Sequence, residues 1–193
     1  MVSNYSQLSI KQFLLCKMIS ETEADPLQRN IRLLSEITGI EVERLENHFP
    51  IGELTAMLND LGKLDNSLED KKVRMTFRCG GKRFKVKWKQ QELTASQYID
   101  STTFARSNPI EQIHNILASI CVEVDWLGIE RPYDGAKHKE VSELFYNNLK
   151  IEVAYPIMLF FCKYLNELQT TTQTFLVAEV ERMRADFGVS MVG

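Results

Sequence analysis

Apolar residues at helical spacing organise the first part of the chain. Ser9 can cap a helix from Ile10 to about residue 19, and Asp25-Pro26 is a strong start signal for a second helix. Gly39 is placed to end that second helix. A short segment over residues 41–47 follows, and Pro50 opens another helix. Isolated helices of this length are marginal in water, so we expect these to pack together as an N-terminal helical region over residues 1–63.

The period of the pattern changes from helical to alternating near residue 72. Apolar and polar residues alternate over 73–77 and again over 84–88, as in half-buried strands. Gly80-Gly81 between them can supply the positive φ angles of a tight hairpin turn. The pattern predicts an antiparallel β-hairpin over about residues 72–88, in a segment 72–90 that a polar linker at 64–71 joins to the helices before it.

Helical spacing resumes in the second half of the chain. Thr94 can cap a helix, and Asn108-Pro109 is expected to start another, with an apolar stripe that runs from residue 110 to Cys121. The stretch 125–135 reads as an ordered loop. Helices are then expected over about 136–149 and from Ile151 toward residue 183, where the β-branched run 170–172 is a candidate interruption. The predicted fold is therefore mainly α, a multi-helix bundle with one antiparallel β-hairpin, in which residues 91–193 form a C-terminal helical domain.

The charge of the predicted hairpin is extreme. Between Lys71 and Lys89 the chain has nine basic residues and no acidic one. Because the whole chain has 23 basic and 26 acidic residues, the remainder keeps 14 basic residues and a net charge of about −12. Alternation sends most of the hairpin's basic side chains to one face, and we take six as candidate docking residues: Arg74, Arg78, Lys82, Arg83, Lys85 and Lys87.

Three interpretations of this basic face stay open. It can dock a protein partner, bind nucleic acid, or be a solvated face whose lysines discourage edge-to-edge aggregation. The hairpin's aromatic residues lie on the opposite, apolar face, so the stacking platform typical of single-strand binders is absent from the charged side. A protein partner is the preferred interpretation, a solvated face without a specific ligand is second, and nucleic acid is third.

The last helix is apolar over more than one narrow stripe between residues 153 and 168. Such a helix is either central to a core, the preferred interpretation, or partly committed to a partner. In the second case Phe160, Phe161 and Tyr164 join the candidate docking residues.

No pattern of catalytic or metal-binding residues occurs. The three histidines are isolated, no CxxC is present, and no GxSxG, P-loop or GxGxxG motif is found. We therefore expect no enzyme, and no catalytic, cofactor or metal site. Three of the four cysteines lie in apolar helical surroundings and are expected to be buried, whereas Cys79 falls at the hairpin turn and is expected to be exposed.

The location of the protein is expected to be cytoplasmic. Residues 1–7 lack the basic and apolar regions of a signal peptide, and the longest apolar stretch, 153–162, is half of the ~20 residues that span a bilayer. We therefore expect no membrane partner.

The second half of the chain resembles a group of small tailed-bacteriophage proteins, the tail assembly chaperones. The resemblance rests on spaced apolar and turn residues: Leu93-Thr94, Gln97-Tyr98-Ile99-Asp100, His114-Asn115-Ile116-Leu117-Ala118, Pro132-Tyr133-Asp134-Gly135, Leu144-Phe145, Pro156 and Phe160-Phe161. The match weakens after Asp100, where Ser101-Thr102-Thr103 replaces an apolar continuation.

Such chaperones are understood to coat the long tape-measure protein until the tail tube polymerises around it, without a cofactor. The resemblance implies a non-enzymatic phage assembly protein in the infected bacterial cell that binds a long helical client, such as a tape-measure protein or another virion protein. Two alternatives remain: a structural or cargo protein carried in the virion, and a nucleic-acid-binding protein that uses the basic hairpin. Oligomerisation is left open.

Overall fold

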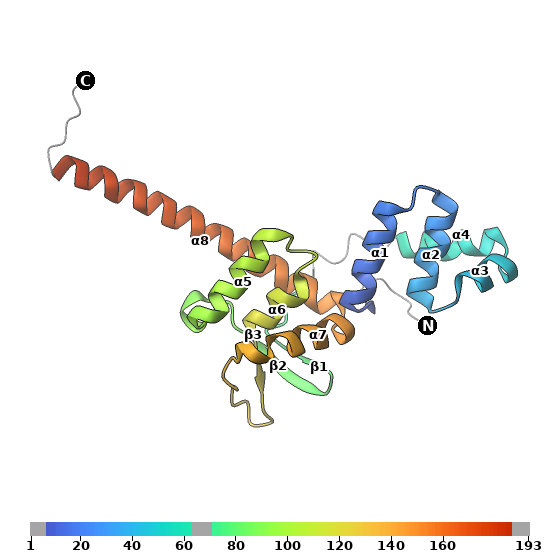
Figure 1. Cartoon of the computed structure of the whole chain (residues 1–193), viewed down its shortest axis with the longest axis horizontal. Helices are drawn as coiled ribbons and strands as arrows, with labels where there is room; N and C mark the ends of the chain where they lie inside the picture. The colour runs from blue at the N-terminus through green and yellow to red at the C-terminus, as the bar shows by residue number, and fades with distance from the viewer. Residues whose placement is uncertain (1–6, 63–70, 187–193) are drawn as a thin grey trace, which may run out of the picture.

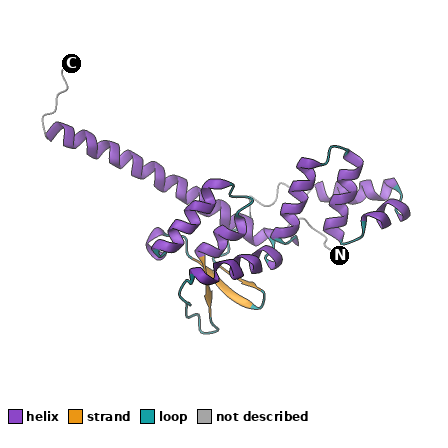
Figure 2. Cartoon of the chain, in the orientation of Figure 1, coloured by secondary structure: helices purple, strands orange, loops and turns teal. Residues whose placement is uncertain are grey.

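The computed structural model describes residues 7–62 and 71–186 of the chain. It confirms the predicted class, since the protein is mainly helical (66% helix, eight α-helices in the described residues) with a small antiparallel sheet (Figure 2). All but the last residue of the linker expected at 64–71 lies outside the described residues. The division into regions is therefore still a prediction.

The capping signals read from the sequence begin and end the N-terminal helices. Ser9 and Gln12 form a reciprocal capping box at the start of α1, and Asp25 caps α2 with Pro26 in its first turn. Gly39 ends α2 with a φ of 72°, in the left-handed region that glycine adopts without strain. The four helices are α1 (Ile10–Thr22), α2 (Pro26–Thr38), α3 (Val42–His48) and α4 (Ile51–Gly62).

These helices divide between two apolar cores. Residues of α2, α3 and α4 form a small cluster of their own: Ile31, Leu34, Leu45 and Leu54. Helix α1 belongs instead to the main core, and the backbone beside it is bound to the start of the last helix. The amide of Ile10 donates to the carbonyl of Leu149 at 3.0 Å, and the amide of Ile151 donates to the carbonyl of Leu8 at 2.8 Å. The first helix is thereby held against the C-terminal part of the chain (Figure 1).

The sheet contains the predicted hairpin and one further strand. Strands β1 (Thr76–Cys79) and β2 (Lys82–Val86) pair through a turn at Gly80 and Gly81, whose φ angles are 56° and 76°. Two consecutive positive φ angles are those of a type I′ hairpin turn. Strand β3 (Cys121–Val124) then adds antiparallel to β2, so the order is β1-β2-β3.

The third strand corrects the expectation for this segment. The helix expected from Asn108-Pro109 begins later, as α6 (Ile113–Ile120), and the apolar stripe that appeared to continue through Cys121 passes directly into β3. A short apolar run fits a buried helix and a buried strand equally well, so periodicity alone could not locate this boundary.

The sheet packs on α7 (His138–Asn148) through three phenylalanines. The ring centroids of Phe84 and Phe145 are 4.7 Å apart, and those of Phe77 and Phe145 are 5.6 Å apart. Cys79 also points into this core and donates its thiol to the carbonyl of Leu144, so the expectation that it is exposed was wrong. Burial raises the pKa of the Cys79 thiol to about 11.

The remaining helices complete the C-terminal body. They are the short 3₁₀ helix η3 (Gln90–Glu92), α5 (Ala95–Ser107) with its Thr94–Gln97 capping box, η4 (Gly135–Lys137), and α8 (Ile151–Asp186). Helix α8 runs without interruption through 170–172, contrary to the suggested break, and its 36 residues span about 54 Å. Its C-terminal half extends away from the other elements (Figure 1).

Candidate functional site

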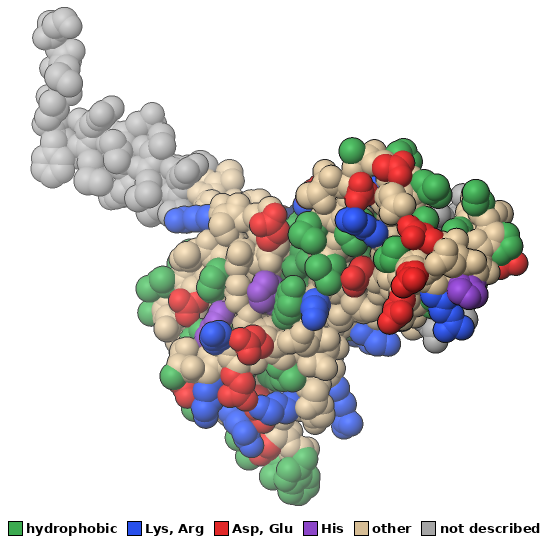
Figure 3. Space-filling view, turned by 45° about the vertical axis from the view of Figure 1, so that its right-hand side comes forward, with side chains coloured by type: hydrophobic (Ala, Val, Ile, Leu, Met, Phe, Trp, Pro, Cys, Tyr) green, Lys and Arg blue, Asp and Glu red, His purple; other side chains and the backbone are tan. Residues whose placement is uncertain are grey.

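Three large apolar side chains are exposed on the loop that follows β3. Trp126 is 86% exposed, and Leu127 and Ile129 are each 62% exposed. Single exposed apolar residues are common on proteins, but a group of three that includes a tryptophan is a candidate interaction surface. Figure 3 shows hydrophobic side chains gathered beside basic ones at the lower end of the molecule, where this loop lies. We call Trp126, Leu127 and Ile129 the apolar tip.

Asp125 holds the loop in one shape. Its Oδ1 accepts hydrogen bonds from the amides of Leu127 at 2.9 Å and Ile129 at 2.8 Å. Its own amide donates to the carbonyl of Ile129, and the amide of Gly128, at φ 84°, donates to the carbonyl of Asp125. A loop with its backbone groups paired in this way presents the apolar tip with little further ordering on binding.

Two counter-charges of the basic hairpin, Glu123 and Glu130, come from β3 and the loop after it. The Glu130 carboxylate lies 2.7 Å from the Nζ of Lys85 and 2.8 Å from the Nζ of Lys87. Hydrogen bonds from these two lysines hold the pKa of the Glu130 carboxyl below its usual range. Glu123 lies 3.6 Å from Lys82 and 3.0 Å from Arg131. Four basic groups of the hairpin and the loop after β3 therefore already have a carboxylate partner within the chain.

Two arginines of the hairpin face each other without such a partner. Arg78 of β1 is directly opposite Arg83 of β2, and Arg83 is in turn opposite Val124 of β3. Both arginines are exposed, and the structure records no carboxylate bonded to either among the described residues. Arg74 is also exposed and precedes β1. The outer face of the sheet thus carries a free pair of cations beside the base of the apolar tip.

The candidate docking residues of the last helix lie elsewhere in the structure. Phe161 is 1% exposed and belongs to the main core. Phe160 and Tyr164 are half-buried and stand edge-on to Trp88, with ring centroids 5.2 and 5.3 Å from it. The hydroxyl of Tyr164 accepts from the amide of Gln90. These two side chains attach the segment after β2 to α8 and do not adjoin the basic face.

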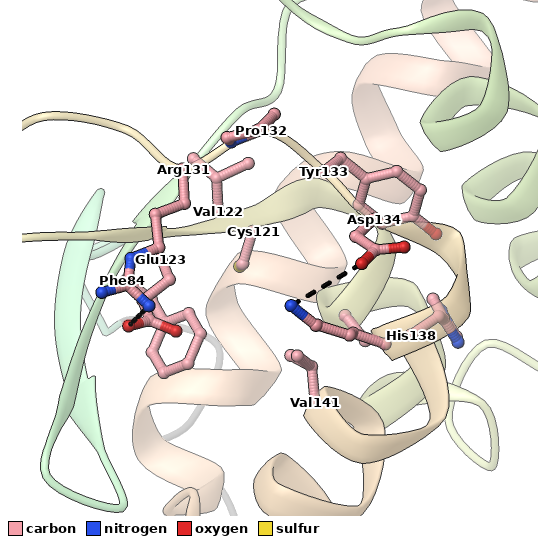
Figure 4. Close-up of a pocket in the computed structure, with 12 residues that line it drawn as sticks. Phe84, Cys121, Val122, Glu123, Arg131, Pro132, Tyr133, Asp134, His138 and Val141 are labelled. Atoms are coloured by element: carbon pink, nitrogen blue, oxygen red, sulfur yellow. Dashed lines mark ion pairs between the residues drawn. The ribbon is translucent and has the colours of Figure 1, made fainter.

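A small cavity of about 110 Å³ lies between β3, the loop after it and α7 (Figure 4). Tyr133 lines it and donates its hydroxyl to Asp100 at 2.8 Å; burial and this acceptor raise the pKa of Tyr133 well above its ordinary value. Lys137 pairs with Asp134, and Arg131 with Glu123, around the same space.

Ser119 and His138, beside this cavity, are not arranged as a nucleophile and its base. His138 Nε2 lies 3.1 Å from Ser119 Oγ and 3.2 Å from the carbonyl oxygen of Asn115. The nearest acceptor for the Ser119 hydroxyl is the Asn115 carbonyl oxygen, at 2.9 Å. Ser119 is also 0% exposed and donates its hydroxyl to the same carbonyl. The arrangement is that of a structural hydrogen-bond network.

The described ranges, 7–62 and 71–186, hold no group of three or more His, Cys, Asp or Glu side chains arranged to bind a metal. Within the same ranges, no helix combines the length and apolarity needed to cross a membrane.

The sequence carried a signal for the apolar tip that we did not use. Val-Asp-Trp-Leu-Gly-Ile-Glu, over residues 124–130, has an aspartate that can accept from its own backbone and a glycine three positions later. This is the pattern of a hairpin loop, and it places a tryptophan at the turn, where a buried position is not available.

Comparison with known proteins gives no assignment: no family, no curated protein and no solved structure matches this chain.

Proposed function

We propose that this chain is a non-enzymatic phage assembly protein, a tail assembly chaperone that binds a long helical client such as a tape-measure protein. The observation that carries the binding function is the apolar tip, in which an 86% exposed Trp126 stands on a loop shaped by Asp125. Burying one such aromatic side chain in a partner contributes about 2–3 kcal/mol, which is the scale of an interface hot spot. An exposed tryptophan contributes nothing to the stability of the fold, whereas it can contribute to the free energy of binding a partner.

The client assignment rests on the resemblance in the second half of the chain. Several residues that carry the resemblance bind one another or their neighbours within the fold. Gln97 donates its side-chain amide to the carbonyl of Ser119 at 2.9 Å, and Tyr133 donates to Asp100 at 2.8 Å. The resembling pattern therefore corresponds to residues that join α5, α6 and the loop after β3. This supports a structural role for these residues.

The nucleic-acid alternative has less support than the basic composition suggested. Of the nine basic residues between Lys71 and Lys89, five have a carboxylate partner among the residues that the structure describes: Lys71, Lys82, Lys85, Lys87 and Lys89. A duplex phosphate would have to displace these partners or compete with their charges. A phosphate backbone also offers no apolar surface that could cover the apolar tip.

The proposal is tested by co-expression with the tape-measure candidate encoded by a neighbouring gene. The chain should keep that client soluble and co-purify with it. A client that is equally insoluble with and without the chain, and absent from the purified material, would contradict the proposal.

A role as a structural or cargo protein of the virion is decided separately. Mass spectrometry of purified particles would show the chain at a stoichiometric level if it is a virion component, and would not show it if it acts only during assembly.

A further inference from the structure

The facing arginines on the sheet are an arrangement that the fold alone does not explain. Residues directly opposite in an antiparallel pair have Cβ atoms about 5 Å apart, and like charges there destabilise the sheet. Arg78 and Arg83 occupy such a pair. The next pair on the same face, Thr76 and Lys85, does not repeat this conflict, because threonine carries no charge and Lys85 is bonded to Glu130. The free like-charge pair is therefore confined to one rung of the ladder.

This rung adjoins the apolar tip. Arg83 lies opposite Val124, which is two residues before Trp126. The loop that carries the apolar tip therefore leaves the sheet beside Arg83, which is itself paired with Arg78. Guanidinium groups bind carboxylates in a planar, two-pronged geometry, and two of them that face each other suit a pair of acidic side chains.

We propose that Arg78 and Arg83 form a carboxylate-binding site which, together with the apolar tip, recognises an acidic segment of a protein partner that carries a large apolar residue beside its carboxylates. This inference rests on the proposed binding function and names the chemistry of the client segment. The site binds two carboxylates of the partner, and the apolar tip enters the apolar part of the same segment.

The charges around the site favour a protein segment over other anionic surfaces. Glu130 stands among the cations of this face and repels an unbroken row of phosphates or anionic lipid headgroups. A protein segment can place its carboxylates at the arginine pair alone. Contact between two copies through this face would bring two arginine pairs together, so charge repulsion opposes that assembly.

The experiment uses the full chain as bait for a displayed library of short random peptides. Enriched peptides should combine Asp or Glu pairs with a large apolar residue. A synthetic peptide of the enriched type should bind about tenfold or more weakly to Arg78→Gln/Arg83→Gln, because charge-assisted hydrogen bonds are lost. The double variant should also melt at a higher temperature than the wild type, since the like-charge pair is relieved. If the two arginines served only folding, their replacement would lower the melting temperature. A higher melting temperature together with weaker peptide binding therefore assigns them to binding.

The control is Arg44→Gln/Arg106→Gln, which removes the same charge from exposed positions on α3 and α5. It should leave peptide affinity unchanged. The site would be overturned if no peptides were enriched or if the enriched peptides lacked carboxylates. It would also be overturned if the control lost as much peptide affinity as the double variant. Binding of duplex DNA or phosphatidylglycerol vesicles that depends on Arg78 and Arg83 in place of peptide binding would likewise overturn it. A failure of the phage client to co-purify would count against the proposed function alone, because the peptide result does not depend on that client.

Discussion

The Nζ of Lys85 in β2 lies 2.7 Å from Oε1 of Glu130, although 45 residues separate them along the chain. The same carboxylate also holds Lys87. The basic hairpin is therefore neutralised in part by a loop that the fold brings beside it. The sequence shows nine basic residues in one segment, whereas the folded surface shows a mixture of paired and free cations.

Replacement of Glu130 by Gln should strengthen nonspecific binding to polyanions. The change frees Lys85 and Lys87, so the log–log salt slope of duplex DNA binding should steepen by about one to two units. Fluorescence titration at several salt concentrations measures this slope.

The control for this prediction is Glu21→Gln, which frees Lys17 on α1 and changes the net charge equally. Its slope should match the wild type. An equal rise in both variants would mean that net charge, and not the Glu130 pairing, limits polyanion binding.

Gly80→Ala should destabilise the protein more than Gly81→Ala. Both glycines have positive φ angles, which cost a residue with a Cβ about 1–2 kcal/mol. A Cβ at Gly80 would also overlap the Leu144 side chain of α7, whereas at Gly81 it would meet open space. Overpacking adds about 1–3 kcal/mol, so we expect about 2–5 kcal/mol for the first change and about 1–2 kcal/mol for the second, by urea unfolding. Equal losses would show that Leu144 moves aside at no cost.

His114 should make the protein less stable in mild acid. Burial, and secondarily the charge of His138, lower the pKa of His114, and its Nδ1 is buried without a hydrogen-bond partner in the described residues. Above the ordinary value of 6.5, His114 is neutral in both folded and unfolded chains. As pH falls below 6.5 the unfolded chain takes up a proton first, so the free energy of unfolding decreases.

The His114→Gln variant isolates this contribution. Urea unfolding at about pH 7.5 and about pH 5.5 should show a larger loss for the wild type than for the variant. The groups that line the space beside His114, Lys139 and Glu143 among them, are common to both proteins. Identical losses would assign the acid sensitivity to other groups.

The Cys79 thiol should react slowly in the folded protein. With a pKa of about 11, its thiolate fraction at pH 8 is roughly one thousandth, about a hundredfold less than that of an ordinary exposed cysteine. Comparison of wild type and Cys79→Ser with a thiol reagent, before and after denaturation, isolates this group. Rapid native reaction that the serine variant lacks would place Cys79 at the surface.

The sequence predicted correctly the helix caps and the hairpin turn, which depend on residues only a few positions apart. The Ser9 and Thr94 capping boxes and the Gly80-Gly81 turn act within a few residues, and the structure has each of them where the sequence places it. Strand β3 was missed because Cys121 continues the apolar stripe of α6, and only its pairing with Val86 of β2 decides that it is a strand.

The candidate site was predicted only in part for the same reason. Alternation correctly identified the exposed faces of Arg78, Arg83 and Lys85. It could not reveal that Glu130 neutralises Lys85 or that the loop of Trp126 leaves the sheet beside Arg83, because both depend on β3 joining the sheet. Counter-charges that come from distant segments are absent from a count along the chain.

The most direct test of the binding function is client binding by Trp126→Ser. Because Trp126 is exposed in the free chain, the melting temperature should stay close to that of the wild type, whereas affinity for the co-purified tape-measure client should fall about thirtyfold. Isothermal titration with wild type, Trp126→Ser and the exposed control Ile51→Ser measures this difference. A variant that binds the client as tightly as the wild type would contradict the account, as would an equal loss in the Ile51 control.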